Sequence, residues 1–131
     1  MNNKERKEIA HKGDRIKLML NDVNSMLIIG EPECGKSLLC GYLENSIKEE
    51  PLVLELGDIK GKRKHKMKDF SSIVNKVILI DDAHKLDIDS IINNLSLITE
   101  DSKKVVMFSS ENNSLERIKE HVDKTISFSQ I

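Results

Sequence analysis

The residues from Gly30 to Ser37 carry the clearest chemical signal in this 131-residue chain. They read Gly-Glu-Pro-Glu-Cys-Gly-Lys-Ser, which places two glycines, a lysine and a hydroxyl at the spacing of the phosphate-binding loop, also called Walker A. Gly30 and Gly35 allow the backbone to curl, so that successive N–H groups point inward at a helix N-terminus, where anions are favoured. We expect Lys36 to reach the β- and γ-phosphates of a nucleotide and the Ser37 hydroxyl to ligate Mg²⁺.

The flanks of this loop have the composition that the chemistry requires. A short apolar run, 25–29, precedes the loop and an apolar, helix-prone run follows it, which gives the order strand, loop, helix. A chance glycine-rich turn is the alternative. The sequence predicts that the chain binds ATP through the following residues: Gly30, Glu31, Pro32, Glu33, Cys34, Gly35, Lys36, Ser37 and Leu38.

A second candidate site follows the apolar run 76–80, where Asp81 and Asp82 stand next to each other. A carboxylate at the end of such a strand, downstream of a phosphate loop, is typical of a Walker B element, because one carboxylate must hold Mg²⁺ beside the phosphates. We expect Asp81 and Ser37 to bind the metal and Asp82 to activate water; glutamate is more usual there, and the shorter aspartate favours slow hydrolysis. The alternative is a solvated pair that caps a turn, and His84 is expected to be a packing or surface residue.

Two hydroxyls, Ser109 and Ser110, end another apolar run. Ligands of a parallel sheet lie beyond the carboxyl ends of its strands, so a hydroxyl at this position would face the γ-phosphate or the attacking water. A polar turn leading into residues 111–113 is equally compatible with these residue types. With this hydroxyl included, the residues predicted to be catalytic are Lys36, Asp82 and Ser110.

The segments that must position these residues alternate between strand-like and helix-like patterns. We expect strands at 25–29, 52–56, 76–80, 105–108 and 125–128, and helices at 36–48, 87–99 (capped by Asp87) and 114–122, with a short helix or turn at 70–74. The stretch 3–20 has the spacing of an amphipathic helix that is interrupted or restarted near Gly13. Strands that alternate with helices imply a parallel sheet covered on both faces. We therefore predict an α/β fold, a three-layer sandwich with a five-stranded parallel sheet, in which an N-terminal helical segment (1–22) precedes a nucleotide-binding domain (23–131).

The bulk composition limits the class of protein. A chain of 131 residues with net charge −1 and 33% charged residues describes one ordinary soluble domain with a modest core. Aromatic residues make up 3% and Trp is absent, which argues against binding nucleic acid by base stacking. Two cysteines give no disulfide framework, and the sequence contains neither a signal-peptide core nor an apolar run long enough for a membrane span. We expect a cytoplasmic protein.

The most basic stretch of the chain follows the second expected strand. Its residues are Lys60, Lys62, Arg63, Lys64, Lys66 and Lys68. Concentrated positive charge indicates an anionic partner, and neutralisation of phosphates is the main source of non-specific affinity for DNA. A solvated loop without a partner is the alternative.

Taken together, the loop 30–37, the run 77–84 and the run 105–110 resemble the core of an AAA+ ATPase, and the resemblance covers residues 20–131. The chain is similar to the replication-initiator clade, including small DnaA-related regulators in which an Asp-Asp pair at Walker B is familiar, and to transposition-helper and secretion ATPases. The resemblance implies the AAA+ sheet order, ATP and Mg²⁺ as cofactors, and nucleotide-driven assembly on DNA, with a protein partner or as a homo-oligomer. It makes Ser109 or Ser110 the first sensor.

Two features depart from the family pattern. Family members usually place an arginine shortly before the fifth strand, where it reaches a neighbour's γ-phosphate, whereas this chain has Lys124, which cannot form a planar bidentate clamp. Arg117, on the preceding helix, is a substitute candidate. The helical lid that covers adenine is not found before Ile131, so we expect either a naturally minimal protein or part of a longer one. In either case we expect reduced nucleotide affinity and turnover.

Three functional classes follow from these features. The first is a nucleotide switch with weak ATPase activity that acts on DNA or on a replication or transposition complex. The second is an adaptor that binds nucleotide with little or no hydrolysis. The third, a small-molecule kinase, is disfavoured because phosphoryl-transfer lids need clamping arginines and this chain has only Arg6, Arg15, Arg63 and Arg117. Stimulation of phosphate release by DNA would distinguish the first class from the second.

Overall fold

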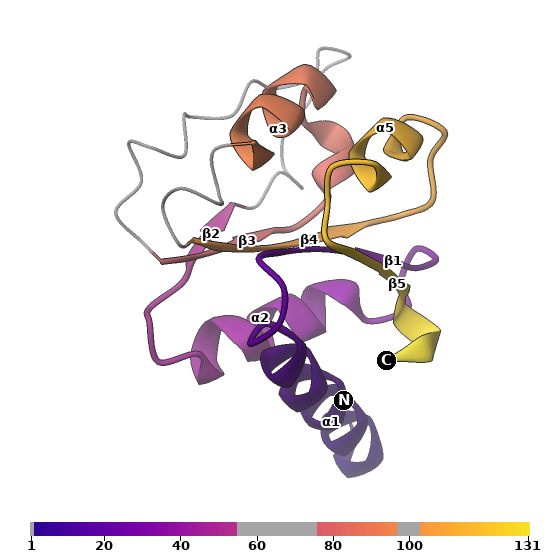
Figure 1. Cartoon of the computed structure of the whole chain (residues 1–131). Coiled ribbons are helices and arrows are strands. Elements are labelled where there is room, and N and C mark those ends of the chain that lie inside the picture. The colour runs from indigo at the N-terminus through magenta and orange to yellow at the C-terminus, as the bar shows by residue number, and fades with distance from the viewer. Residues whose placement is uncertain (1, 55–75, 97–102) are drawn as a thin grey trace.

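The computed structural model describes residues 2–54, 76–96 and 103–131 (Figure 1). The basic stretch from Lys60 to Lys68, the helix or turn predicted at 70–74 and the predicted element ends at 55–56 and 97–99 lie outside the described residues. Of the helices in the described part, none is both long and apolar enough to cross a membrane.

Five parallel strands form one sheet. They are β1 (Ser25–Ile29), β2 (Leu52–Leu54), β3 (Val77–Ile80), β4 (Lys104–Ser109) and β5 (Lys124–Ser127), in the order β2-β3-β4-β1-β5. Ile29 of β1 lies opposite Ser109 of β4, and Ile80 of β3 lies opposite Met107. Because every strand runs in the same direction, the carboxyl ends of β1, β3 and β4 meet at one edge, where ligands of such sheets bind.

Helices cover both faces of this sheet. Figure 1 shows α1 (Asn3–Met19) and α2 (Lys36–Ser46) on one face and α3 (Ile88–Leu95) and α5 (Leu115–Lys119) on the other. Two 3₁₀ turns, η2 (Ala83–Lys85) and η3 (Phe128–Gln130), follow β3 and β5. The predicted α/β fold with three layers and a five-stranded parallel sheet is confirmed.

The core forms two hydrophobic clusters, one on each face of the sheet. Along β1 the side chains alternate: Leu27 and Ile29 belong to the cluster beneath α3 and α5, whereas Met26 and Ile28 belong to the cluster beneath α1 and α2. This alternation is the two-residue period of a strand that is buried on both faces. The polar residues at the ends of the strands are therefore positioned by strands that are packed on both faces.

The helix N-termini show why the elements begin where they do. The Asp87 carboxylate accepts a hydrogen bond from Ser90 N at 3.0 Å, so the predicted cap of α3 is confirmed. α2 begins differently: its N-cap is Gly35, with a φ of 115° and no side-chain hydrogen bond. The first N–H groups of α2 are left without a side-chain cap, on the side where the phosphate loop lies.

The interruption of α1 predicted near Gly13 is wrong. α1 is continuous from Asn3 to Met19, and a Cβ at Gly13 would clash with the ring of Tyr42 in α2. The glycine therefore lets Tyr42 approach the helix and does not break it. The Tyr42 hydroxyl donates a hydrogen bond to Asp14 at 2.8 Å, which lowers the pKa of that carboxyl from its usual value.

Four predicted elements end earlier than expected, and one of them is the helix predicted at 87–99, which ends at Leu95. α2 ends at Ser46 and β5 at Ser127, and the helix predicted at 114–122 is confined to Leu115–Lys119. Beyond α5, Asp123 accepts hydrogen bonds from Asn24 N at 2.7 Å and from Ser25 N at 3.2 Å, which ties this part of the chain to the start of β1.

The segment predicted as separate, 1–22, contributes to the same core as the rest. Ile9, Ile16 and Leu20 of this segment lie in one cluster with Leu39 and Phe108. The division of the chain at residues 22 and 23 stays a prediction.

Candidate functional site

The loop between β1 and α2 is curled tightly, and its glycines are required by contact as well as by conformation. A Cβ at Gly30 would lie 2.7 Å from the Cys34 sulfur and 2.9 Å from Cβ of Phe128, closer than side chains approach. Gly35 has a left-handed φ of 115°, and Glu33 also has a positive φ, of 63°. The loop thus has the tight backbone that the motif implies.

Lys36 lies buried inside this loop with only 7% of its surface exposed. Its ammonium donates hydrogen bonds to Gly30 O at 2.7 Å and to Glu31 O at 2.6 Å, and lies 3.7 Å from the Cys34 sulfur. No carboxylate of the described residues lies within ion-pair distance of it. Since carbonyl dipoles compensate a buried charge only in part, the centre of the loop attracts an anion.

Ser37 and Asp81 meet across the sheet edge. The Ser37 hydroxyl donates a hydrogen bond to Oδ2 of Asp81 at 2.7 Å, and Oδ1 of Asp81 accepts one from Asp82 N at 3.0 Å. The two side chains come from α2 and from the end of β3, which are 44 residues apart in sequence. Together they provide hard oxygen donors of the kind that Mg²⁺ prefers.

The donor set is small. In the described part of the chain, no group of three or more His, Cys, Asp and Glu side chains could hold a metal ion. Mg²⁺ is typically held by one or two protein ligands and takes the rest from water and substrate phosphates. Ser37 and Asp81 fit that kind of site.

Asp82 faces a different neighbour. Its backbone is left-handed, with a φ of 56°, and its carboxylate lies 3.5 Å from the Lys85 ammonium, one turn further along η2. Aspartate is among the residues that tolerate this conformation best. The residue predicted to activate water is therefore held in an ion pair in this structure.

His84 contacts the end of β4. Its Nδ1 lies within hydrogen-bond distance of the Ser109 hydroxyl, at 3.2 Å, and the same hydroxyl lies 2.8 Å from Ser110 O. Ser109 is fully buried, and its carbonyl accepts a hydrogen bond from Gly30 N at 3.1 Å. The turn after β3, the end of β4 and the start of the phosphate loop are thus joined through Ser109. The sensor role predicted for Ser109 or Ser110 stays a prediction.

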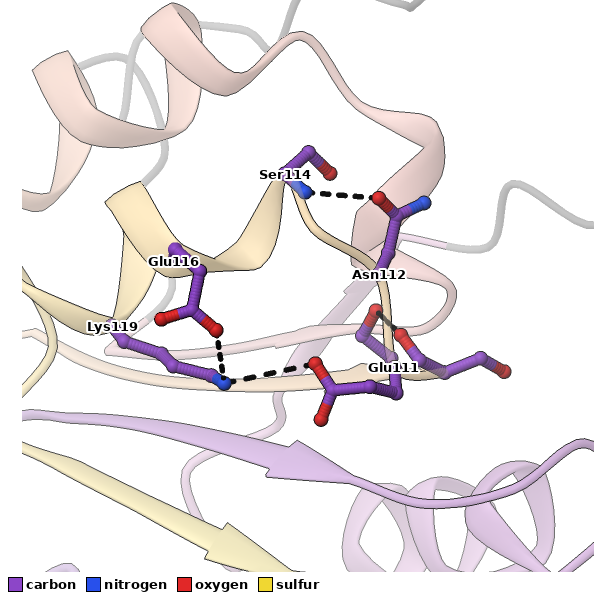
Figure 2. A network of polar contacts seen from close by, with 7 residues as sticks. Glu111, Asn112, Ser114, Glu116 and Lys119 are labelled. Carbon is purple, nitrogen blue, oxygen red and sulfur yellow. Dashed lines mark hydrogen bonds and ion pairs between the residues drawn. The ribbon is translucent and has the colours of Figure 1, made fainter.

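The segment that follows Ser110 is anchored to α5. Figure 2 shows Lys119 between two carboxylates, with its ammonium 3.6 Å from Glu111 and 2.9 Å from Glu116. The hydrogen bond with Glu116 raises the pKa of Lys119. Asn112 accepts a hydrogen bond from Ser114 N at 2.9 Å, just before α5 begins. α5 therefore fixes the path of the chain beyond β4.

A cavity of about 450 Å³ opens beside the phosphate loop. Residues of the loop, Glu111 and the stretch Ser127 to Ser129 line it. Its volume lies in the range of small-molecule sites. The cavity adjoins Gly30 and Cys34, so a ligand held by the loop could extend into it.

Phe128 packs against both glycines of the phosphate loop. Sequence reasoning missed this role. Its ring atom Cζ would lie 3.2 Å from a Cβ at Gly35, and its own Cβ lies close to Gly30. Lys12 of α1 donates a hydrogen bond to Phe128 O at 3.0 Å, and its ammonium lies 4.9 Å from the centroid of the ring. The sequence offered no signal for this contact, because Phe128 reads as the last residue of a strand nearly a hundred positions away from the loop.

Two other candidates lie away from the loop. Arg117 pairs with Asp89 of α3 at 2.9 Å, and both side chains are exposed. Lys124 begins β5 opposite Met26, at the sheet edge far from the carboxyl ends of the strands. Neither side chain is directed to the phosphate loop of its own chain.

Comparison with known proteins identifies the fold. The sequence profile of the ATPase family associated with various cellular activities (AAA) matches residues 26–125. The DNA polymerase III gamma subunit-related protein of Thermotoga maritima is similar in structure, with a TM-score of 0.56 and 17% identity over 88% of this chain and 45% of that one. The RuvB Holliday junction branch migration motor of the same organism gives a TM-score of 0.54 and 12% identity over 98% and 45%. A Bacteroides Pif1 helicase in complex with ADP-AlF3 and ssDNA gives 0.50 and 14% over 84% and 35%.

At these identities the structural likeness shows the fold alone. No curated protein sequence matches the chain. The chain spans less than half the length of each of these structures. The AAA profile, however, covers most of the sequence, including both loop glycines, Lys36 and the two aspartates. The chain therefore belongs to the AAA family of ATPases.

Proposed function

We propose that the chain is an ATP-binding switch of the AAA+ type with slow Mg²⁺-dependent hydrolysis. The observation that carries the proposal is the buried Lys36 ammonium, which is held by loop carbonyls at the N-terminus of α2. A triphosphate would provide the negative charge that no described side chain supplies there. Lys36 would then donate to phosphate oxygens where it now donates to the backbone.

The roles of the other residues follow from where they stand. Ser37 and Asp81 would hold Mg²⁺, which neutralises charge on the phosphates when bound. Asp82, on the adjacent turn, would accept the proton of the attacking water, and Ser110 would report the γ-phosphate as first sensor. Of the remaining loop residues, Glu31 and Glu33 would contribute backbone N–H groups, whereas Pro32 has none and Cys34 N already donates to Glu31 O at 3.3 Å.

A second candidate function, an adaptor with little or no hydrolysis, is favoured by one observation. The Asp82 carboxylate is paired with Lys85 at 3.5 Å, and it must leave this partner before it can act on a water molecule. Lys124, at the position where family members usually carry an arginine, also favours the adaptor function.

We further propose that the switch is a cytoplasmic protein that acts on DNA, with a protein partner or as a homo-oligomer. It would belong to the initiator-like or transposition-helper branches of the family. The support is the basic stretch Lys60 to Lys68 and the Asp81–Asp82 pair in the sequence. Two of the similar structures are a branch migration motor and a helicase bound to ssDNA, although this likeness extends to the fold alone.

The proposal predicts ATP turnover that depends on DNA. Phosphate release by the whole chain with Mg²⁺ is expected to rise several-fold, on the order of tenfold, when duplex DNA is added at about 50 mM salt, and to lose this rise near 200 mM salt. Replacing Lys62, Lys64 and Lys66 by alanine should remove the stimulation and leave basal release unchanged. ATP binding without release under any condition would favour the adaptor, and stimulation that survives the triple substitution would contradict the role of the basic stretch.

Phe128 provides a separate prediction about nucleotide affinity. Phe128→Ala is expected to weaken ATP binding about tenfold, roughly 1.4 kcal/mol, because both loop glycines lose the surface against which they are packed. Titration with a fluorescent ATP analogue, far below the unfolding temperature, measures this change. Phe128→Leu, which keeps part of the apolar side chain and adds no polar atom, should lose less affinity than Phe128→Ala.

Ile118→Ala is the matched control for that loss. Ile118 is also buried, but it lies in the cluster on the opposite face of the sheet. Its truncation should cost about 2–5 kcal/mol of stability and leave ATP affinity unchanged. An equal loss of affinity in both variants would show that Phe128 acts through stability and not through the loop.

A further inference from the structure

The helix α1 has two faces of opposite character. Ile9, Gly13, Ile16 and Leu20 are buried against α2 and the sheet. On the opposite side, residues three and four apart form an exposed stripe, which we name the α1 basic stripe: Lys4, Lys7, His11 and Arg15. This spacing places them on one side of an α-helix, because 3.6 residues make one turn.

The cations of this stripe differ from two other lysines of α1, which have partners. Lys12 is bound to Phe128 O, and Lys17 pairs with Asp14 at 3.1 Å. Lys4, Lys7 and Arg15 form no ion pair with any residue in the described ranges. α1 carries six Lys or Arg and three Asp or Glu, a net charge of +3, in a chain whose total is −1. All four stripe residues are exposed, and one acidic residue, Glu8, lies beside Lys4, Lys7 and His11.

We propose that the α1 basic stripe binds the phosphate backbone of nucleic acid. Lys4 and Arg15 lie about 16 Å apart along the helix axis, a length over which one strand of DNA presents about five phosphates. Long cationic side chains repeated every 4.5–6 Å, roughly, can each neutralise a phosphate along such a strand. The surface is distinct from the basic stretch 60–68 and does not require bound ATP. The inference depends on the proposed function in one respect: that function gives nucleic acid as the class of ligand.

An anionic membrane fits this surface less well. Helices that lie in a membrane interface insert an apolar face. The apolar face of α1 is already in the core, and Leu18 is the one large apolar side chain within α1 that is exposed. Charge without an apolar anchor favours a polyanion in solution.

The test compares two double variants of the whole chain without ATP. Lys7→Ala with Arg15→Ala removes two stripe cations, and Lys48→Ala with Lys76→Ala removes two exposed lysines elsewhere. Alanine keeps α1 helical. Binding to a fluorescent 20-base-pair duplex is measured between 50 and 200 mM salt, and the logarithm of the affinity is plotted against that of the salt concentration.

The slope of the stripe variant is expected to be shallower than that of the wild type by about 1.8, while the control keeps the wild-type slope. The affinity of the stripe variant should be about tenfold or more weaker near 0.1 M salt. Equal slopes in the wild type and the stripe variant would overturn the inference and leave DNA binding through other residues standing. Binding to phosphatidylserine vesicles with none to the duplex would also overturn it. ATP affinity, measured in parallel, should be unchanged in both variants, so a failure of the stripe is distinguishable from a failure of the nucleotide site.

Discussion

Replacing Lys36 by alanine is expected to weaken ATP binding by at least about 100-fold. The ammonium would make two or more charge-assisted hydrogen bonds to phosphate oxygens, each worth roughly 1.5–3 kcal/mol. The structure holds this group at the start of α2, buried and directed into the loop, so little ordering is required when a phosphate binds. Titration of a fluorescent ATP analogue in the presence of Mg²⁺ measures the loss.

The same substitution should leave the fold intact. Gly30 and Glu31 would lose a donor to their carbonyls, but these belong to a loop that water reaches, and no carboxylate would be left unpaired. The unfolding midpoint is therefore expected to change little. Lys48→Ala, which removes an exposed lysine just beyond α2, is the control and should bind ATP normally. Undiminished ATP binding by the Lys36 variant would contradict the proposed function.

The fold was predictable from the sequence because the strands are short apolar runs with clear limits. Runs such as 25–29 and 77–80 are apolar at nearly every position, as strands covered on both faces must be, and each is followed by the loop or carboxylates of the site. The meeting of Ser37 with Asp81 followed from the same reasoning, since the carboxyl ends of parallel strands share an edge.

Contacts between distant segments were not predictable in this way. Gly13 reads as a helix breaker, yet it makes room for Tyr42, a residue of another helix. Phe128 reads as the end of a strand, yet its ring supports both loop glycines. The ion pair of Asp82 with Lys85 depends on a left-handed backbone at Asp82 that residue type alone does not reveal. In each case the deciding fact is a packing contact or a dihedral angle, and a periodic pattern carries neither.

Asp82→Asn is expected to separate hydrolysis from binding. The amide keeps the size of the carboxylate but cannot accept the proton of the attacking water. Phosphate release should fall about 100-fold, the low end of what a general base contributes, while ATP affinity stays within about twofold of the wild type. Single-turnover phosphate release and equilibrium titration give the two numbers separately.

Asp81→Asn makes the same chemical change one residue earlier and should behave differently. Asp81 accepts hydrogen bonds from the Ser37 hydroxyl and from Asp82 N, so losing its charge should remove the Mg²⁺ dependence of ATP binding itself. Lys85→Ala removes the partner that holds the Asp82 carboxylate and should raise turnover, because the carboxylate is then free to turn toward the attacking water. Phosphate release at the wild-type rate in Asp82→Asn would show that another group activates the water. A wild type and a Lys85 variant that both bind ATP without releasing phosphate would mean that the bound nucleotide, not its hydrolysis, carries the signal.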